Sequence, residues 1–254
     1  MAHLTFDICP CPALYPYYHQ EDSVVVVVDI LRAGTSMVAA FDHGAKEIIP
    51  VATTDEAESF LGKGYVVAAE RNAMRCPWAD LGNDPSEFTA ERIGGRSIVF
   101  TTTNGTQAIH AAREAGAAEI IVGAFSNLSA VARHCQASRR AVTVLASGWQ
   151  NSFCIEDTLY GAALLDKLEE LGATYRLTDS SRTALELYRQ HQAHLYDYLY
   201  NCDHNQRLIQ RGYPESLRHC LEQDSSTHIP TLNDAGQLYV KTAALNANFR
   251  TFAT

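Results

Sequence analysis

The stretch Val24-Val25-Val26-Val27-Val28-Asp29-Ile30-Leu31-Arg32-Ala33-Gly34-Thr35 decides the fold class of this chain. Its consecutive valines predict a strand at 24–29 that is buried on both faces, because a half-exposed strand would alternate with polar positions. Asp29 and Arg32 follow the valines, and Gly34-Thr35 can begin a helix. Since open α/β sheets bind ligands at the carboxyl ends of their strands, the stretch predicts a parallel sheet with a ligand site beside Asp29.

Composition limits the class of protein. The chain has 254 residues, of which 46% are hydrophobic, enough for one large domain or two small ones. Its apolar runs are far shorter than the roughly 20 residues that span a bilayer, and residues 1–18 lack a signal-like pattern. We therefore expect a soluble cytoplasmic protein that does not bind membranes. The formal net charge of -9 argues against general nucleic-acid binding, so an anionic ligand would need a local cationic patch or a metal ion.

The cysteines follow no metal-binding or disulfide pattern. There are seven, an odd number, and only Cys9 and Cys11 are close in sequence. No second pair stands at zinc-ligand spacing. We expect reduced thiols that pack in the interior.

An internal repeat predicts a duplicated βαβα unit. Each copy has a strand before it, at 24–29 and at 97–102, and a helix, a strand and another helix after its first glycine. The second copy begins about 72 residues after the first. The first copy reads Gly34-Thr35, Ala39-Ala40 and Gly44-Ala45-Lys46-Glu47-Ile48-Ile49, and the second reads Gly105-Thr106, Ala111-Ala112 and Gly116-Ala117-Ala118-Glu119-Ile120-Ile121.

The remaining periodicity completes an α/β pattern. Strands and helices that alternate through short connections favour a mainly parallel sheet with helices on both sides. The region 180–221 has apolar residues at helical intervals. We expect further strands at 65–69 and 141–146, and helices at 33–43, 54–61, 106–115, 127–135 and 156–171.

No linker-like composition divides the chain. We therefore treat 1–254 as a single unit. Within it, we expect a duplicated α/β core at 1–175 and a helical cap or flank, followed by a C-terminal strand, at 176–254.

The second copy carries a candidate anion site, Thr101-Thr102-Thr103-Asn104-Gly105-Thr106. Here a strand runs into a glycine turn and then a helix, whose free backbone N–H groups and hydroxyls can cradle a phosphate or sulfonate. The alternative is an Asn or Thr helix cap without a ligand. The matching turn at 29–35 favours the anion site.

Three other polar clusters lie at strand ends or in loops. Glu70-Arg71 follows the strand at 65–69 and is either a surface ion pair or part of the same site. Asn83 lies in the turn Gly82-Asn83-Asp84-Pro85, where a neighbour can simply cap a helix. Glu156-Asp157 either complements the dipole of a helix or supplies oxygen ligands for Mg²⁺.

Together these motifs resemble, in order and spacing over 24–171, the 2-phosphosulfolactate phosphatases, the ComB family. Gly34 stands where that family commonly has a second Thr, and Asp84 where it has a Ser. The resemblance implies a three-layer α/β/α fold. It also implies Mg²⁺-dependent removal of phosphate from 2-phospho-3-sulfolactate, the reaction type of coenzyme M biosynthesis.

The groups at these positions suit hydrolysis of a small anionic phosphoester. Mg²⁺ and arginines can neutralise a phosphomonoester dianion before a nucleophile approaches. Asp29 is a metal ligand, a base for water or a covalent nucleophile. We favour metal-activated water, because Leu31 breaks the Asp-x-Asp pattern of haloacid dehalogenase phosphatases. We expect catalytic roles for Asp29, Arg32, Glu70 and Arg71, substrate binding by Thr35, Asn83, Thr103, Asn104, Gly105 and Thr106, and metal binding by Asp29, Glu156 and Asp157.

Two other functions stay open from the residues. One is a phosphatase for a different small phosphorylated hydroxy acid, and the other is a non-catalytic anion-binding module. No Gly-x-Gly-x-x-Gly fingerprint or P-loop supports a nucleotide enzyme. The sequence leaves the oligomeric state open, with a symmetric homodimer as the commonest arrangement for soluble enzymes.

Overall fold

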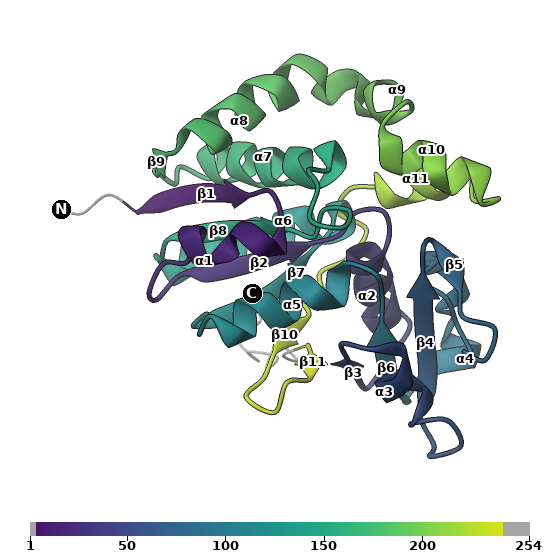
Figure 1. Ribbon diagram of the computed structural model, residues 1–254. Helices are drawn as coiled ribbons and strands as arrows, with labels where there is room; N and C mark the ends of the chain where they lie inside the picture. Colours follow the sequence, from purple (N-terminus) through teal and green to yellow (C-terminus); the bar gives the residue numbers. More distant parts are fainter. Residues whose placement is uncertain (1–3, 241–254) are drawn as a thin grey trace, which may run out of the picture.

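The valine run forms a strand, β2, in the middle of a large sheet (Figure 1). The computed structural model describes residues 4–240. The sheet has eleven strands in the order β5 (Met74–Arg75), β4 (Val66–Arg71), β6 (Ser97–Thr101), β3 (Glu47–Pro50), β11 (Leu238–Tyr239), β10 (Thr231–Leu232), β7 (Glu119–Gly123), β2 (Val24–Val28), β8 (Val142–Ala146), β1 (Thr5–Cys9) and β9 (Arg176–Leu177).

The sheet consists of two parallel groups joined by an antiparallel hairpin, with β5 pairing antiparallel to β4 at one edge. One group contains β7, β2, β8, β1 and β9, and the other contains β3, β6 and β4. The hairpin β10–β11 lies between them, with Thr231 opposite Ile121 and Leu238 opposite Ile48. The expected C-terminal strand is therefore one arm of a hairpin in the centre of the sheet.

The two copies of the repeat are interleaved across these groups. The first copy supplies β2 and β3, and the second supplies β6 and β7. β2 pairs with β7 and β3 pairs with β6, so each parallel group takes one strand from each copy. The registers are equivalent, because Val24 lies opposite Glu119 and Ser97 lies opposite Glu47.

Helices cover both faces of the sheet, which confirms the α/β class and the three-layer arrangement. The helices are α1 (Tyr15–Tyr18), α2 (Ala33–Asp42), α3 (Thr54–Glu58), α4 (Ala90–Ile93), α5 (Gly105–Glu114), α6 (Leu128–Ser138) and α7 (Ile155–Glu170), with single 3-10 turns at η1 (Pro12–Leu14), η2 (Pro85–Glu87) and η3 (Phe125–Asn127). The bounds of α2, α3, α5, α6 and α7 agree with the expected ones to within a few residues, whereas the short helices α1 and α4 were not expected.

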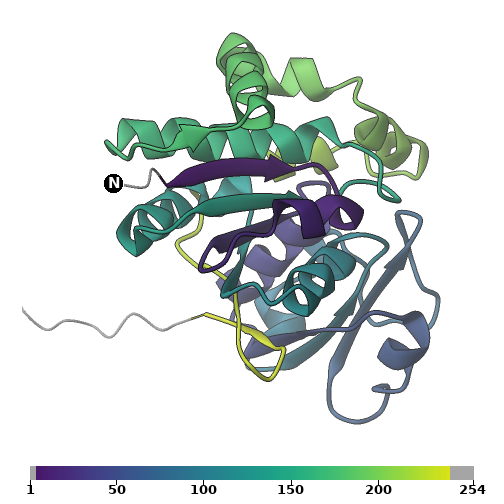
Figure 2. The ribbon, with the colours of Figure 1, turned by 60° about the vertical axis from the view of Figure 1, so that its left-hand side comes forward.

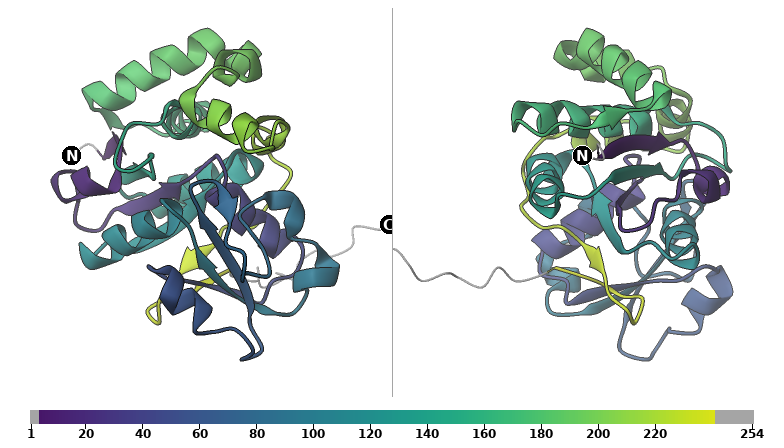
Figure 3. Two further views of the ribbon diagram at one scale, coloured as in Figure 1. Left: turned by 45° about the vertical axis from the view of Figure 1, so that its right-hand side comes forward. Right: turned by 90° about the vertical axis from the view of Figure 1, so that its left-hand side faces the viewer.

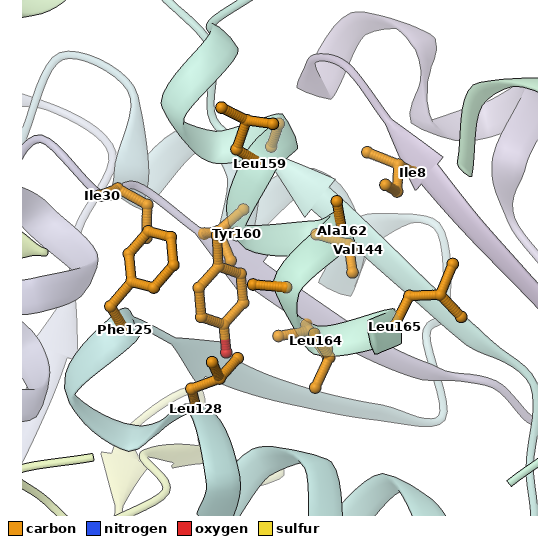
Figure 4. Packing of buried hydrophobic residues seen from close by; sticks show 14 of the residues in the cluster. Ile8, Ile30, Phe125, Leu128, Val144, Leu159, Tyr160, Ala162, Leu164 and Leu165 are labelled. Carbon is orange, nitrogen blue, oxygen red and sulfur yellow. The ribbon is translucent and has the colours of Figure 1, made fainter. Parts of the chain in front are cut away.

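The β2 side chains alternate between two hydrophobic cores. Val24, Val26 and Val28 pack with the α6 and α7 side, whereas Val25 and Val27 pack with the α2 and α5 side. All five are at most 2% exposed, so the expectation of a strand buried on both faces is confirmed. Figure 4 shows the first core, in which the Phe125 and Tyr160 rings pack edge to face with their centroids 5.5 Å apart.

The region 180–221 is helical, as expected, and forms a further layer outside α7 (Figure 2). Its apolar residues Leu185, Leu199 and Leu208 belong to the same core as α7. Figure 3 (left) shows α10 and α11 near the carboxyl ends of the central strands, facing the β4–β5 hairpin. The elements are α8 (Asp179–His191), η4 (Gln192–His194), α9 (Leu195–Leu199), α10 (Asp203–Gln210) and α11 (Ser216–Cys220).

Two expectations from composition can be compared with the described residues. All seven cysteines are free thiols, and all but the half-buried Cys202 are buried, which confirms reduced, packed cysteines. Within residues 4–240, no helix is both long enough and apolar enough to cross a membrane.

Candidate active site

Asp29 lies between the first turns of two helices. It follows β2, is only 7% exposed, and accepts a hydrogen bond at Oδ1 from the N–H of Ala33, the first residue of α2, at 3.2 Å. A Cβ added to Gly105, the first residue of α5, would lie 2.8 Å from the Cβ of Ala33 and 2.9 Å from Oδ2 of Asp29. The repeat therefore brings the equivalent helix starts of its two copies together at one carboxylate.

Arg32 is fixed from several sides. Its Nη1 donates to Asp84 at 2.8 Å and its Nη2 to Oδ1 of Asn83 at 2.9 Å. The guanidinium carbon lies 3.9 Å from the centre of the Tyr213 ring. Its Nε is buried and has no hydrogen-bond partner among the described residues. Arg32 thus has a set orientation and one unused donor.

Glu70 ties two loops together. Its Oε1 accepts from the N–H of Ala73 at 2.5 Å and from the hydroxyl of Thr103 at 3.0 Å. Its Oε2 accepts from the N–H of Thr103 at 3.2 Å. Because these bonds join the turn after β4 to the turn after β6, Glu70 acts on the site by holding the two turns in place.

Many of the sequence-predicted residues line one small cavity at this end of the sheet. Asn104 precedes α5, and its Oδ1 accepts from the N–H of Gln150 at 3.1 Å, which connects the β6 and β8 turns. The cavity is narrow, about 10 Å³ in volume, and is lined by Asp29, Leu31, Arg32, Glu70, Ala73, Asn83, Asn104, Trp149, His204 and Leu208.

Glu156 and Asp157 point to different partners, as adjacent residues on a helix must. Asp157 accepts from the N–H of Ile30 at 2.9 Å and from the N–H of Gly148 at 3.2 Å. It therefore fastens α7 to the ends of β2 and β8. Oε1 of Glu156 lies 2.7 Å from Nδ1 of His204, and the His204 ring lines the cavity in front of it.

The buried carboxylates shift one another's proton affinity. Burial raises the pKa of Asp29 to about 6, with further upward contributions from Glu70 and Glu156 and a downward one from His204. Burial and the charges of Glu156 and Asp29 raise the pKa of Asp157 well above its ordinary value. Burial also disfavours the charged form of Glu156, but the hydrogen bond and charge of His204 outweigh it and lower the pKa.

This crowding of acids fits a divalent cation. Oδ2 of Asp29 has no hydrogen-bond donor among residues 4–240, and carboxylate oxygens are the ligands that Mg²⁺ prefers. Asp157 has both oxygens bonded to the backbone, and Glu156 is paired with His204. Asp29 is thus the one predicted ligand that faces the cavity. Glu156 also lies within 4.8 Å of Cys154 and His204, a set whose sulfur and nitrogen suit a softer metal than Mg²⁺.

Three predicted residues face away from the cavity. Arg71 donates to the carbonyl of Glu70 at 2.6 Å and to the hydroxyl of Thr101 at 2.9 Å, on the outer side of the Glu70 turn. The Thr35 hydroxyl donates to the carbonyl of Ile30 at 3.0 Å. The Thr106 hydroxyl exchanges bonds with the Thr102 backbone at 3.3 and 3.4 Å, within the first turn of α5.

Sequence reasoning missed part of the cavity wall. Trp149 follows β8, and that position at a strand end is the signal that could have indicated it. His204 and Leu208 come from α10, whose helical pattern carries no such signal. Ala73 lies in the turn after β4. Asp84, which departs from the family pattern, supplies the carboxylate that pairs with Arg32.

Comparison with known proteins gives a consistent assignment. A model of the family described as 2-phosphosulpholactate phosphatase matches residues 9–235. A protein of Caldanaerobacter subterraneus subsp. tengcongensis is 36% identical over 218 residues, which cover 84% of this chain and 89% of that protein. A protein of Thermotoga petrophila is 35% identical, covering 84% and 90%. One of Synechocystis sp. is 30% identical, covering 89% and 95%. All three carry the name "Probable 2-phosphosulfolactate phosphatase".

Proposed function

The chain belongs to the 2-phosphosulpholactate phosphatase family, and from this membership we propose that it hydrolyses 2-phospho-3-sulfolactate to sulfolactate and phosphate with Mg²⁺ as cofactor. It is accordingly a phosphoric monoester hydrolase. We also propose that the reaction serves coenzyme M biosynthesis in the cytoplasm, as the family resemblance implies.

The convergence of two helix starts and Arg32 on Asp29 is the observation that supports this proposal. The N-terminal ends of α2 and α5 carry the positive ends of their helix dipoles, which attract phosphate, and at α2 the N–H groups of Ala33 and Gly34 donate to Asp29. Arg32 adds a full charge and an unused Nε donor in the same cavity. In a buried site these groups stabilise the charge on the phosphoryl oxygens while the ester bond breaks.

Asp29 takes the role of base in this scheme. Its Oδ2 orients the attacking water and receives a proton from it, and a pKa of about 6 leaves the carboxylate ionised at neutral pH. The water oxygen bonds to phosphorus as the bond from phosphorus to the ester oxygen breaks, and the proton taken up by Asp29 then passes to the departing ester oxygen. The products are inorganic phosphate and the hydroxy acid.

Mg²⁺, when bound, neutralises phosphoryl oxygens and makes the attacking water more acidic. We propose that Asp29 would hold the ion from the cavity side through a water molecule, so that its Oδ2 stays free to accept the proton. Glu156 and Asp157 are the further acids near this ion. Glu156 raises the pKa of both Asp29 and Asp157, and Asp29 raises that of Asp157, so a bound cation would relieve the repulsion among the three carboxylates.

The test is phosphate release from 2-phospho-3-sulfolactate in Mg²⁺ and after chelation with EDTA. Asp29→Asn and Glu156→Gln proteins should lose roughly 100-fold or more of the Mg²⁺-dependent rate, a typical effect of removing one charge-stabilising group. Circular dichroism must match the wild type for the loss to count. Release that continues at the wild-type rate in EDTA or in Asp29→Asn would refute the proposal.

A further inference from the structure

Arg207 on α10 has no hydrogen bond or ion pair within residues 4–240, although its charge helps to lower the pKa of Glu156. Its guanidinium carbon lies 4.3 Å from the centre of the Trp149 ring. Its Nε is buried, and within residues 4–240 no acceptor binds it. A buried donor left without an acceptor carries an uncompensated desolvation penalty, so this position is suited to a ligand that supplies an acceptor.

Arg207 repeats the arrangement of Arg32. Each guanidinium lies against an aromatic ring, and each has a buried Nε without an acceptor. Stacking on an aromatic ring does not by itself leave an arginine Nε buried without an acceptor. Arg218 lies 4.7 Å from the Tyr196 ring, but it is exposed and has Glu215 3.7 Å away.

The groove beside Arg207 adjoins the Asp29 cavity. Trp149 and His204 line both spaces, and the groove measures about 440 Å³. Two acids also line it, Glu156 and Asp203. Glu156 is bonded to His204, and Asp203 is exposed at the rim, so neither forms an ion pair with Arg207.

We propose that Arg207, held on Trp149, binds the sulfonate of the substrate, while Arg32 faces its phosphate. This inference rests on the proposed function and assigns the two anionic groups to two guanidiniums. The planar fork of arginine suits an oxyanion such as a sulfonate or a carboxylate. The sulfonate fits better, because it stands one carbon farther than the carboxylate from the carbon that bears the phosphate, and the groove lies beyond the cavity wall formed by Trp149.

Product binding tests the subsite without requiring turnover. Isothermal titration with sulfolactate, lactate, isethionate and inorganic phosphate would compare the wild type with Arg207→Met, Arg207→Lys and Arg218→Met. Arg207→Met should weaken sulfolactate and isethionate binding roughly 10- to 150-fold, which is the size of a lost charged hydrogen bond. Arg207→Lys should recover part of it. Lactate and phosphate should bind all four proteins equally, and Arg218→Met should match the wild type throughout.

The subsite assignment and the proposed function fail on different outcomes. Wild-type affinity for sulfolactate in Arg207→Met, or no sulfolactate binding by the wild type, would overturn it. Loss of lactate binding together with sulfolactate binding would make Arg207 a carboxylate site and overturn the sulfonate assignment. If the wild type binds sulfolactate through Arg207 but releases no phosphate from the ester, the proposed function fails while the subsite stands. A thermal melt of each variant confirms that it is folded.

Discussion

Gly105 lies so close to Asp29 that a side-chain carbon at position 105 would come within 2.9 Å of Oδ2. The same carbon would meet the Cβ of Ala33 at 2.8 Å. Position 105 must therefore be glycine, because only a residue without a side chain lets the starts of α5 and α2 approach the same carboxylate. Distances below about 3 Å between such atoms force the backbone or the carboxylate to move.

Gly105→Ala should consequently damage catalysis more than stability. The added methyl would displace Asp29 or separate the two helix starts, costing about 1–3 kcal/mol of folding free energy and most of kcat/KM. Urea unfolding and a phosphate-release assay measure the two effects. Gln107→Ala, at an exposed position on the same helix turn, is the control and should change neither. An active Gly105→Ala protein would contradict the close approach.

Asp29→Asn should be more stable than the wild type at alkaline pH. Burial, aided by Glu70 and Glu156, raises the folded-state pKa of Asp29 to about 6, above its unfolded value. The folded state therefore holds the proton more tightly, so the stability from Asp29 is complete below about pH 4 and is lost as the pH rises through 6. The metal-free variant should gain roughly 2–3 kcal/mol over the wild type at pH 8 and nothing at pH 4.

Thermal melts at both pH values, in EDTA, check this linkage. Added Mg²⁺ should raise the Tm of the wild type at pH 8 and leave that of Asp29→Asn unchanged, because binding to the folded state alone stabilises it. If the stability of Asp29→Asn relative to the wild type is lower at pH 8 than at pH 4, then other groups in the folded protein already stabilise the ionised carboxylate of Asp29.

Arg32 and Arg71 should respond differently to the same substitution. Arg32→Lys loses the fork that binds Asp84 and Asn83, together with its contact with Tyr213, and should lower kcat/KM roughly 100-fold. Arg71→Lys changes a half-buried group that binds outside the cavity, and should cost less than about 5-fold. Steady-state kinetics of both variants measure the two losses in kcat/KM. Equal losses would mean that Arg71 reaches the substrate.

Glu70→Gln should loosen the two turns that Glu70 joins. The amide replaces one acceptor oxygen with a donor, which must then face the N–H of Ala73 or that of Thr103. We expect a loss of about 1–3 kcal/mol of folding free energy, and faster hydrogen exchange at both amides. Thr103→Val removes the hydroxyl bond to Glu70 and the bond that the hydroxyl accepts from the N–H of Asn72, and should cost about 1–3 kcal/mol. An unchanged exchange rate in Glu70→Gln would show that the turns do not depend on it.

The local features of this fold were predictable from sequence, and the pairing of distant strands was not. The valines of β2 specify a buried strand by themselves, and the repeat specifies the same elements twice. Nothing near Val24 indicates that its neighbour is Glu119 from the other copy, because strand pairing depends on contacts between distant segments. The hairpin at Thr231 and Leu238 has only two residues in each strand, too few for a periodic pattern.

The residues of the candidate site were likewise predictable from sequence only in part. Asp29, Arg32, Glu70, Asn83 and Asn104 follow strands or turns at one sheet end, and the structure brings them to one cavity. Their roles, and those of Arg71, Thr35 and Thr106, stay predictions. The wall from α10 could not be anticipated, because a helix outside α7 reaches the cavity only through tertiary packing. The partners of Glu156 and Asp157 depend on which way each side chain points from α7.

Because the two copies of the repeat are interleaved, dividing the gene between them would separate paired strands. A fragment that ends between the copies would keep β2 without β7, and the remaining fragment would keep β6 without β3. Neither piece could complete its half-sheet, but the two together could. The same architecture would arise if two identical subunits exchanged strands and were later joined, with Asp29 lying between the equivalent helix starts of the two halves.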